Sequence, residues 1–275
     1  MSDEARTCEA RTCDGRKRVG LALGGGVARG LVHIGVMDVL ERAGVPIDCI
    51  AGTSAGSIMG AVYCAGWPLE RIRHEARQFR WTRFASLVWP RQGLVSFDKL
   101  ERWLVERLGD ITFEELKIPY AAVATDLRTF EPVVLRHGRL APAVRASCSF
   151  PGIITPVEIE GRLLGDGFVT DSVPVSAARA MGADYVIGVD ILAPAIRTGW
   201  GALGYAIAGV EIMAQRAGRG YYQADCLISP NLAGVSYLRL DFEKLVALGE
   251  KAAEERLPAI QTALEAMGTN VPTTQ

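Results

Sequence analysis

Several features that mark common protein classes are absent from this chain or scarce in it. Its formal net charge is -1, so no basic surplus points to nucleic acid as a partner. The most apolar stretch, residues 202–210, is too short to span a bilayer and is followed by Glu211. The N-terminus lacks the apolar core of a secretory signal. These absences favour a cytoplasmic globular protein whose membrane contact, if it has one, is peripheral and on the inner face.

Cysteine is present without the spacing of a metal or redox site. The six cysteines form no C-x-x-C pair. Those in apolar segments are expected to be reduced core residues; they are Cys49, Cys64, Cys148 and Cys226. Residues 4–13 hold two copies of Glu-Ala-Arg-Thr-Cys, for which a redox or metal role is the less favoured alternative. We expect residues 1–17 to be a disordered tail, and we expect no metal and no cofactor.

From residue 18 onward, apolar strands alternate with helices, and no linker interrupts the pattern. This alternation predicts one domain, residues 18–275, with a mostly parallel sheet covered on both faces. Strands are expected at 19–23, 47–51, 120–127, 131–135, 184–191 and 226–229, and a hairpin at 157–164. Helices are expected at 31–43, 57–65, 69–79, 96–108, 140–146, 175–181, 200–219 and 242–267, the last with a break near Gly249 and Pro258.

The segment 78–90 combines aromatic and basic side chains. It holds Phe79, Trp81, Phe84 and Trp89 together with arginines. Such a mixture is typical of a segment at a membrane interface. Core packing of a connecting segment explains it equally well, and the sequence leaves both interpretations open.

The centre of the chain's chemistry is predicted to be Ser54, in the pattern Gly-Thr-Ser-Ala-Gly. A short apolar strand leads in and a helix leads out, which is the context of a nucleophile elbow. Small residues must flank such a serine, because the turn brings the backbone close to the following helix. A chance match to G-x-S-x-G is common in a glycine-rich chain, so the context carries the prediction.

A glycine-rich loop, residues 24–30, lies between the first strand and the first helix. It lacks the Gly-Lys-Ser/Thr of a Walker A loop, and its spacing is one residue too long for G-x-G-x-x-G. Backbone N–H groups at a helix N-terminus can instead hold a transient oxyanion. Arg29 adds a positive charge close by. The candidate binding residues are Gly24, Gly25, Gly26, Val27, Arg29 and Gly30.

A serine nucleophile needs a base, and the sequence offers two. Asp166 stands between two glycines just after an apolar strand, so its loop can approach another backbone closely. A triad of Ser54, Asp126 and His137 has the right order along the chain, but His137 lies at an apparent hairpin tip. Asp166 is favoured, although an Asp-Gly turn stabilised by its own side chain is a common structural explanation.

Together, three segments resemble the patatin-like phospholipases, and especially the bacterial branch related to the catalytic domain of neuropathy target esterase. The segments are Gly24-Gly25-Gly26-Val27-Ala28-Arg29-Gly30, Gly52-Thr53-Ser54-Ala55-Gly56 and Asp166-Gly167-Phe168. The resemblance implies a three-layer α/β/α sandwich that carries a Ser54–Asp166 dyad without a metal. Two residues depart from the family pattern: Val27 replaces a glycine, and Phe168 replaces a glycine or alanine.

The expected function is therefore hydrolysis of carboxylic esters in phospholipids, lysophospholipids or related lipids, with a lipid or membrane surface as partner. Two alternatives remain open at this stage. The same machinery could act on a thioester or a short-chain ester. Alternatively, Val27 and Phe168 could mark a vestigial site in a regulatory protein that binds lipid.

Overall fold

The computed structural model describes residues 16–89, 92–192, 201–217, 223–232, 235 and 241–269. Residues 1–15 of the expected tail lie outside this part. The described chain begins at Arg16, whose guanidinium forms a salt bridge of 2.6 Å with Asp48.

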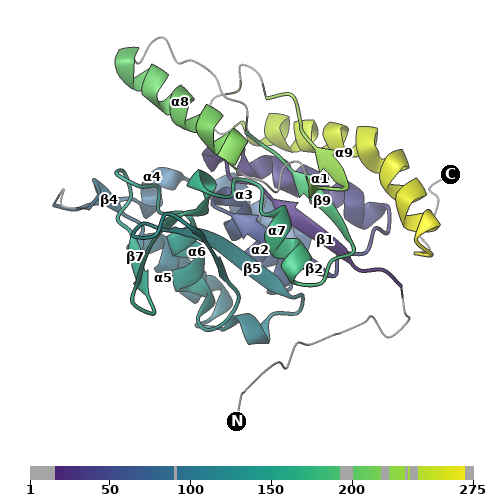
Figure 1. Cartoon of the computed structure of the whole chain (residues 1–275), viewed down its shortest axis with the longest axis horizontal. Coiled ribbons are helices and arrows are strands. Elements are labelled where there is room, and N and C mark those ends of the chain that lie inside the picture. Colours follow the sequence, from purple (N-terminus) through teal and green to yellow (C-terminus); the bar gives the residue numbers. More distant parts are fainter. Residues whose placement is uncertain are drawn as a thin grey trace.

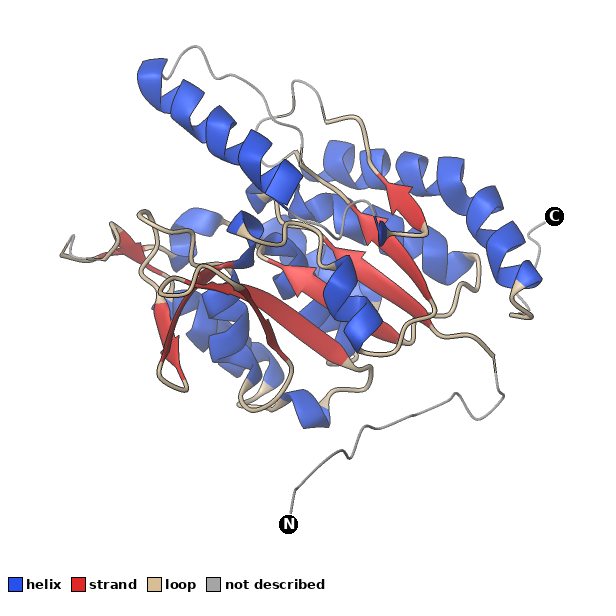
Figure 2. Ribbon diagram, in the orientation of Figure 1, coloured by secondary structure: helices blue, strands red, loops and turns tan. Residues whose placement is uncertain are grey.

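Eight of the described strands form a mixed sheet in the order β10-β9-β1-β2-β5-β8-β7, with β6 also paired to β5 (Figure 2). The strands from β10 to β5 run parallel, whereas β6, β7 and β8 are joined by antiparallel pairing. The bounds are β1 Val19–Leu23, β2 Cys49–Thr53, β5 Tyr120–Asp126, β6 Pro132–Leu135, β7 Val157–Ile159, β8 Arg162–Asp166, β9 Tyr185–Val189 and β10 Cys226–Ile228.

Helices flank this sheet (Figure 1). Their bounds are α1 Val32–Arg42, α2 Ala55–Cys64, α3 Leu69–Gln78, α4 Trp81–Phe84, α5 Asp98–Leu108, α6 Leu140–Ser147, α7 Val175–Ala180, α8 Gly201–Ala217 and α9 Phe242–Ala266. Short 3-10 turns are η1 Val27–Leu31, η2 Phe113–Glu115 and η3 Gly167–Val169. The expected alternation of strands and helices, with its mostly parallel sheet, is confirmed.

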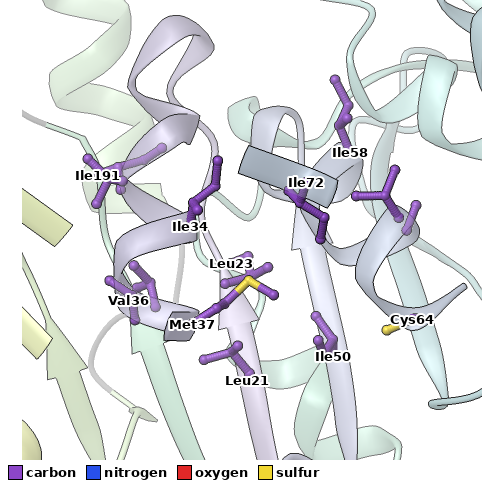
Figure 3. Close-up of a cluster of buried hydrophobic side chains, with 14 of the residues drawn as sticks. Leu21, Leu23, Ile34, Val36, Met37, Ile50, Ile58, Cys64, Ile72 and Ile191 are labelled. Carbon is purple, nitrogen blue, oxygen red and sulfur yellow. The ribbon is translucent and has the colours of Figure 1, made fainter. Parts of the chain in front are cut away.

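The two faces of the sheet are packed by different helices. Leu21 and Leu23 of β1 face the larger core, which α1, α2 and α3 cover (Figure 3). Ala22, between them, faces a smaller core that α7 closes with its alanines. The period-two alternation of a strand thus sends large side chains to the thick helical layer and small ones to the thin layer. This arrangement is the expected three-layer α/β/α sandwich.

The expected break in the last helix is wrong, because α9 runs without interruption from Phe242 to Ala266. Gly249 serves packing: a Cβ at this position would overlap the carbonyl oxygen of Val32 in α1. Pro258 lies on the exposed side of the helix, where water can satisfy the carbonyl that the proline leaves without a donor.

Core packing, one of the two interpretations that the sequence left open, holds for Phe79 and Phe84 of the segment 78–90, of which the structure describes residues 78–89. Phe79 and Phe84 pack against each other, with ring centroids 4.6 Å apart, and both contact Trp103 of α5. Beyond them, β3 (Ser86–Leu87) pairs with β4 (Val95–Ser96) in a hairpin that the sequence reading did not predict. In this hairpin Trp89 is 81% exposed.

Candidate active site

The strand-to-helix turn between β2 and α2 holds Ser54 in a left-handed conformation, with φ of 52°. Such a conformation is costly for a residue with a Cβ, so the surroundings must hold it. The Ser54 N–H donates to Ser147 Oγ at 2.9 Å, and the Ser54 carbonyl accepts from Ser57 Oγ at 2.7 Å. Cys148 Sγ also donates to this carbonyl, at 3.3 Å. The predicted elbow is therefore present and fixed by neighbouring side chains.

Asp166 lies at the end of β8 and accepts the Ser54 hydroxyl, with 2.7 Å between Oγ and Oδ2. Its second oxygen, Oδ1, accepts the Phe168 N–H at 2.9 Å as the cap of η3. Because both carboxylate oxygens are held, the side chain has a fixed orientation toward Ser54. The structure thus brings together the two residues that the sequence put forward.

The Ser54–Asp166 pair lies in a nearly dry environment. Asp166 is 3% exposed and Ser54 is 7% exposed. Burial raises the pKa of Asp166 to about 7, although the hydrogen bonds from Phe168 and Ser54 favour the carboxylate and oppose the shift. An aspartate with this pKa is a stronger base than one in water, and it changes its charge near neutral pH.

The glycine-rich loop lies directly against the elbow. A Cβ on Gly25 would come within 3.2 Å of the Ser54 Cβ and 3.3 Å of the Phe168 ring. The Gly25 N–H donates to the Ser172 carbonyl at 3.0 Å, and the Gly24 N–H donates to the Val189 carbonyl at 3.0 Å. These two donors are therefore occupied, in contrast to the expectation that Gly25 helps to hold an oxyanion.

The next donors along the loop are differently placed. Gly26 caps η1, and the N–H groups of Gly26, Val27 and Ala28 donate to no acceptor within the part of the chain that the structure describes. These are the groups that a 3-10 or α-helical start always leaves without an intrahelical partner. Of the candidate binding residues in the loop, Gly26 and Val27 thus keep N–H groups without an acceptor in the described part of the chain, whereas Gly24 and Gly25 do not.

His33 supports the same loop from α1. Its Nε2 lies 2.8 Å from the Gly24 carbonyl oxygen, and burial lowers its pKa to about 4. The ring is therefore neutral at physiological pH, and Nε2–H can donate to Gly24. With the Gly24 carbonyl and the Gly25 N–H both bonded, the peptide plane between them cannot rotate.

The remaining candidates of the loop have distinct surroundings. Val27 has a φ of 51° and is 42% exposed. This strain has a simple cause, because a β-branched residue stands where the backbone favours glycine. Arg29 is buried, and its guanidinium donates through Nη2 to the Val235 carbonyl at 2.8 Å. Gly30 lies against Ala55 of the elbow.

The alternative base is not brought to Ser54. His137 is exposed on a turn, and its Nδ1 lies 3.1 Å from Glu114 Oε1. Asp126 Oδ1 accepts the Arg128 N–H in the turn after β5. The order Ser54, Asp126, His137 along the chain thus does not correspond to a cluster in space.

Sequence reading missed the residues that hold the elbow from behind. Ser147 Oγ accepts a hydrogen bond from the Ser54 N–H and donates one to the Val123 carbonyl at 2.6 Å. It lies at the end of α6, in a run of small residues, 93 positions from Ser54. Nothing local in the sequence distinguishes this serine from a helix-terminating one; the sheet pairing alone brings it to the turn.

An apolar cavity opens beside the elbow, between η1, α2, α3 and α5. Its lining includes Val27, Ala55, Ile58, Met59, Trp67 and Trp103. Val27 belongs to the glycine-rich loop, and Ala55 directly follows Ser54 in the chain. From there the lining continues over one face of α2 to the aromatic rings of Trp67 and Trp103, whose centroids are 6.3 Å apart.

The fold and this geometry place the chain among α/β proteins with a nucleophile elbow. A family model described as Patatin-like phospholipase matches residues 21–179. The chain belongs to the patatin-like phospholipase family, as its three motifs predicted.

Relatives agree with this assignment, and one solved structure shares the fold. An uncharacterised NTE family protein of Mycobacterium tuberculosis is 39% identical over 63% of this chain and 49% of the relative. Lysophospholipase NTE1 of Saccharomyces cerevisiae is 32% identical over 63% of this chain and 11% of its own length. The crystal structure of VipD from Legionella pneumophila has the same fold, with a TM-score of 0.60 and 14% identity over 94% of this chain and 70% of that one. The chain thus spans about half or less of the curated relatives.

Among the described helices, none combines the length and the apolar character that crossing a bilayer requires.

Proposed function

We propose that this chain is a serine acyl hydrolase that cleaves carboxylic esters of phospholipids or lysophospholipids. The observation that carries the proposal is the 2.7 Å hydrogen bond from Ser54 Oγ to the buried Asp166 carboxylate. The pKa of about 7 supports it, because the carboxylate can then accept the serine proton at neutral pH. Membership of the patatin-like phospholipase family supports the choice of lipid esters.

In the first half of the reaction, Asp166 Oδ2 takes the proton of Ser54 while Oγ attacks the ester carbonyl carbon. The carbonyl oxygen becomes an oxyanion, and the tetrahedral intermediate then expels the alcohol, which takes the proton from Asp166. In the second half, water attacks the acyl-serine and gives a proton to Asp166. Release of the fatty acid returns this proton to Ser54 Oγ.

The oxyanion requires donors that are in position before the reaction begins. We assign this role to the N–H groups of Gly26 and Val27 at the start of η1. Their orientation is set by the preceding peptide, which His33 and Ser172 hold at its two ends. Gly25 then contributes close approach to Ser54 rather than a hydrogen bond.

The cavity beside the elbow supports a substrate with a hydrocarbon chain. Its described lining is apolar except for Glu75, whose carboxylate forms a salt bridge with Arg107 at 3.3 Å. An acyl chain that enters this cavity would have its carbonyl near Val27 and Ala55, the lining residues of the glycine-rich loop and of the turn at Ser54. For the location we propose the cytoplasm, since the buried Cys49, Cys64, Cys148 and Cys226 are all free thiols.

Labelling with a fluorophosphonate tests the dyad without requiring the right substrate. We expect a covalent adduct at Ser54, located by mass mapping, and its loss in Ser54→Ala. In Asp166→Asn we expect the labelling rate to fall at least about a hundredfold, because the hydroxyl has no base. Asp126→Asn is the matched control: this buried carboxylate belongs to the alternative triad and should leave labelling unchanged.

The other outcomes have clear meanings. Full labelling of Asp166→Asn would overturn the dyad. Labelling at Ser54 without turnover of phospholipids, but with turnover of thioesters or short-chain esters, would keep the dyad and change the substrate. No labelling of the folded protein would favour a vestigial site in a lipid-binding protein.

A further inference from the structure

The β3–β4 hairpin presents apolar side chains to solvent. Leu87 is 90% exposed, Trp89 is 81% exposed and Leu94 is 54% exposed. Figure 1 shows this hairpin projecting from the body of the molecule beside α4. Large apolar side chains gathered on a projecting element are costly in water, so they indicate a surface that is covered in use.

Hydrogen bonds and ring contacts fix the base of the hairpin, so its exposed apolar side chains point away from the core. The Val88 N–H donates to the Leu94 carbonyl at 3.3 Å, and the Leu94 N–H donates to the Ile153 carbonyl at 2.8 Å. At the root, the rings of Phe79 and Phe84 pack against Trp103. The aromatic residues of this segment therefore serve two purposes: some anchor the hairpin, and Trp89 extends away from the core.

A basic groove adjoins the root of the hairpin, between α3, α4 and α5. Its charged lining contains more basic than acidic side chains: Arg80, Arg83, Lys99, Arg102 and Arg107 against Glu75 and Glu106. Glu75 is already paired with Arg107. The excess positive charge thus adjoins the root of the hairpin, since Phe79 and Phe84 also line the groove.

The hairpin is also connected to the candidate active site. The Leu94 and Val95 N–H groups both donate to the carbonyl of Ile153, a side chain that is itself 47% exposed. Three residues earlier, Phe150 packs against Phe168, with ring centroids 6.2 Å apart. One short loop therefore joins the exposed hairpin to the residue that holds Asp166.

We propose that the β3–β4 hairpin and the basic groove form a docking surface for an anionic phospholipid bilayer. Leu87 and Trp89 enter the interfacial region, where a tryptophan ring is stable, while the arginines remain at the level of the head groups. Bound in this way, the loop at Ile153 lies at the lipid surface next to the site. The inference builds on the proposed lipid substrate, but its test needs no turnover.

An apolar surface alone would fit a protein partner as well as a membrane. On this surface, the positive charge of the adjoining basic groove favours a membrane over a protein partner. A bilayer with anionic lipids attracts each nearby Lys or Arg by about 1 kcal/mol, without requiring a matched arrangement of carboxylates. The hairpin is narrow and combines few apolar side chains with diffuse charge, which suits a lipid surface better than a shaped protein groove.

Flotation with vesicles tests the proposal on the full chain. With phosphatidylcholine vesicles containing about one third phosphatidylglycerol, we expect binding that weakens in pure phosphatidylcholine and at high salt. The double variant Leu87→Ser, Trp89→Ser should lower the partition coefficient at least about tenfold. Phe130→Ser is the matched control, because Phe130 is a 75% exposed aromatic residue in the β5–β6 turn, outside the hairpin.

Charge is tested by a second pair of variants. Arg80→Gln, Arg83→Gln, Arg102→Gln should lower binding to the anionic vesicles about a hundredfold, from about fivefold for each charge. A triple variant of exposed basic residues elsewhere, Arg42→Gln, Lys117→Gln, Lys251→Gln, should lower it much less.

Tryptophan fluorescence locates the contact. Lipids with brominated acyl chains should quench a component of the emission that is missing in Trp89→Phe. Binding that is unchanged in both hairpin variants, equally lost in the Phe130 control, or absent from anionic vesicles would overturn the proposal. Hydrolysis of a water-soluble ester should be unchanged in the hairpin variants, so failure of docking and failure of the proposed chemistry are distinguishable.

Discussion

Two non-glycine residues beside the same site adopt left-handed backbone conformations: Ser54 with φ of 52° and Val27 with φ of 51°. Their surroundings differ sharply. Ser54 is buried, and hydrogen bonds hold its N–H, its carbonyl and its hydroxyl. Val27 is 42% exposed at the start of a 3-10 turn. The comparison indicates that neighbouring groups hold the strained backbone at Ser54, as the proposed nucleophile requires, whereas the strain at Val27 follows from the choice of side chain.

The largest expected effect concerns Ser54: the rate of its reaction should depend on pH. Because burial raises the pKa of Asp166 to about 7, the proposed base is mostly protonated, and therefore inactive, below that pH. We expect the rate of fluorophosphonate labelling at Ser54 to reach a plateau above neutrality and to fall about tenfold per pH unit below it. At pH 5 the rate should be about a hundredfold below the plateau.

Asp171→Asn is the control for this profile. Burial also raises the pKa of Asp171, to about 6, but its carboxylate accepts from Ser176 and not from Ser54. The variant should keep the transition near pH 7. A flat profile, or a transition near the ordinary aspartate value, would contradict the role given to Asp166.

The same group links stability to pH. Between the ordinary aspartate pKa of 3.8 and about 7, the folded protein keeps a proton on Asp166 that the unfolded chain has released. The free energy of unfolding should therefore fall with rising pH in this window, by up to about 1.4 kcal/mol per unit from this group. Asp166→Asn should lack this slope in urea denaturation, which separates its loss of activity from any loss of fold.

A smaller effect is expected at the support of the elbow. Ser147→Ala removes the acceptor of the buried Ser54 N–H, so we expect the free energy of unfolding to fall by about 1–3 kcal/mol. Because the nucleophile is then less well positioned, kcat should fall about tenfold, with little change in KM.

Ser149→Ala is the matched control for Ser147→Ala. Ser149 is a buried serine two residues further on, whose Oγ donates to the Arg145 carbonyl at 2.9 Å and does not touch Ser54. It should lower stability and leave kcat unchanged. If Ser147→Ala also lowers stability alone, the turn does not depend on Ser147 for its active geometry.

The sequence predicted those parts of the molecule whose signals are local. The alternation of strands and helices, the elbow at Ser54 and the aspartate between glycines all have short patterns, and the structure contains each of them. Ser147 and Ser172 were missed because their partners lie far along the chain, and only the pairing of strands brings them together. The break expected in α9 was wrong for a related reason. Glycine usually interrupts an isolated helix, but here it allows α1 to approach.

The smallest effect concerns Val27, and it tests the other side of the comparison. A left-handed conformation costs a β-branched residue about 1–2 kcal/mol, and glycine relieves this while adding about 0.5–1 kcal/mol of entropy to the unfolded chain. We therefore expect Val27→Gly to raise the free energy of unfolding by up to about 1 kcal/mol.

Val169→Gly is the matched control, since Val169 also lies in a 3-10 turn and is 36% exposed, but has no positive φ. Val169→Gly should lower the free energy of unfolding by about 0.5–1 kcal/mol, the usual cost of a glycine. If both variants lose stability equally, the backbone at Val27 is not strained, and the two left-handed residues differ only in their partners.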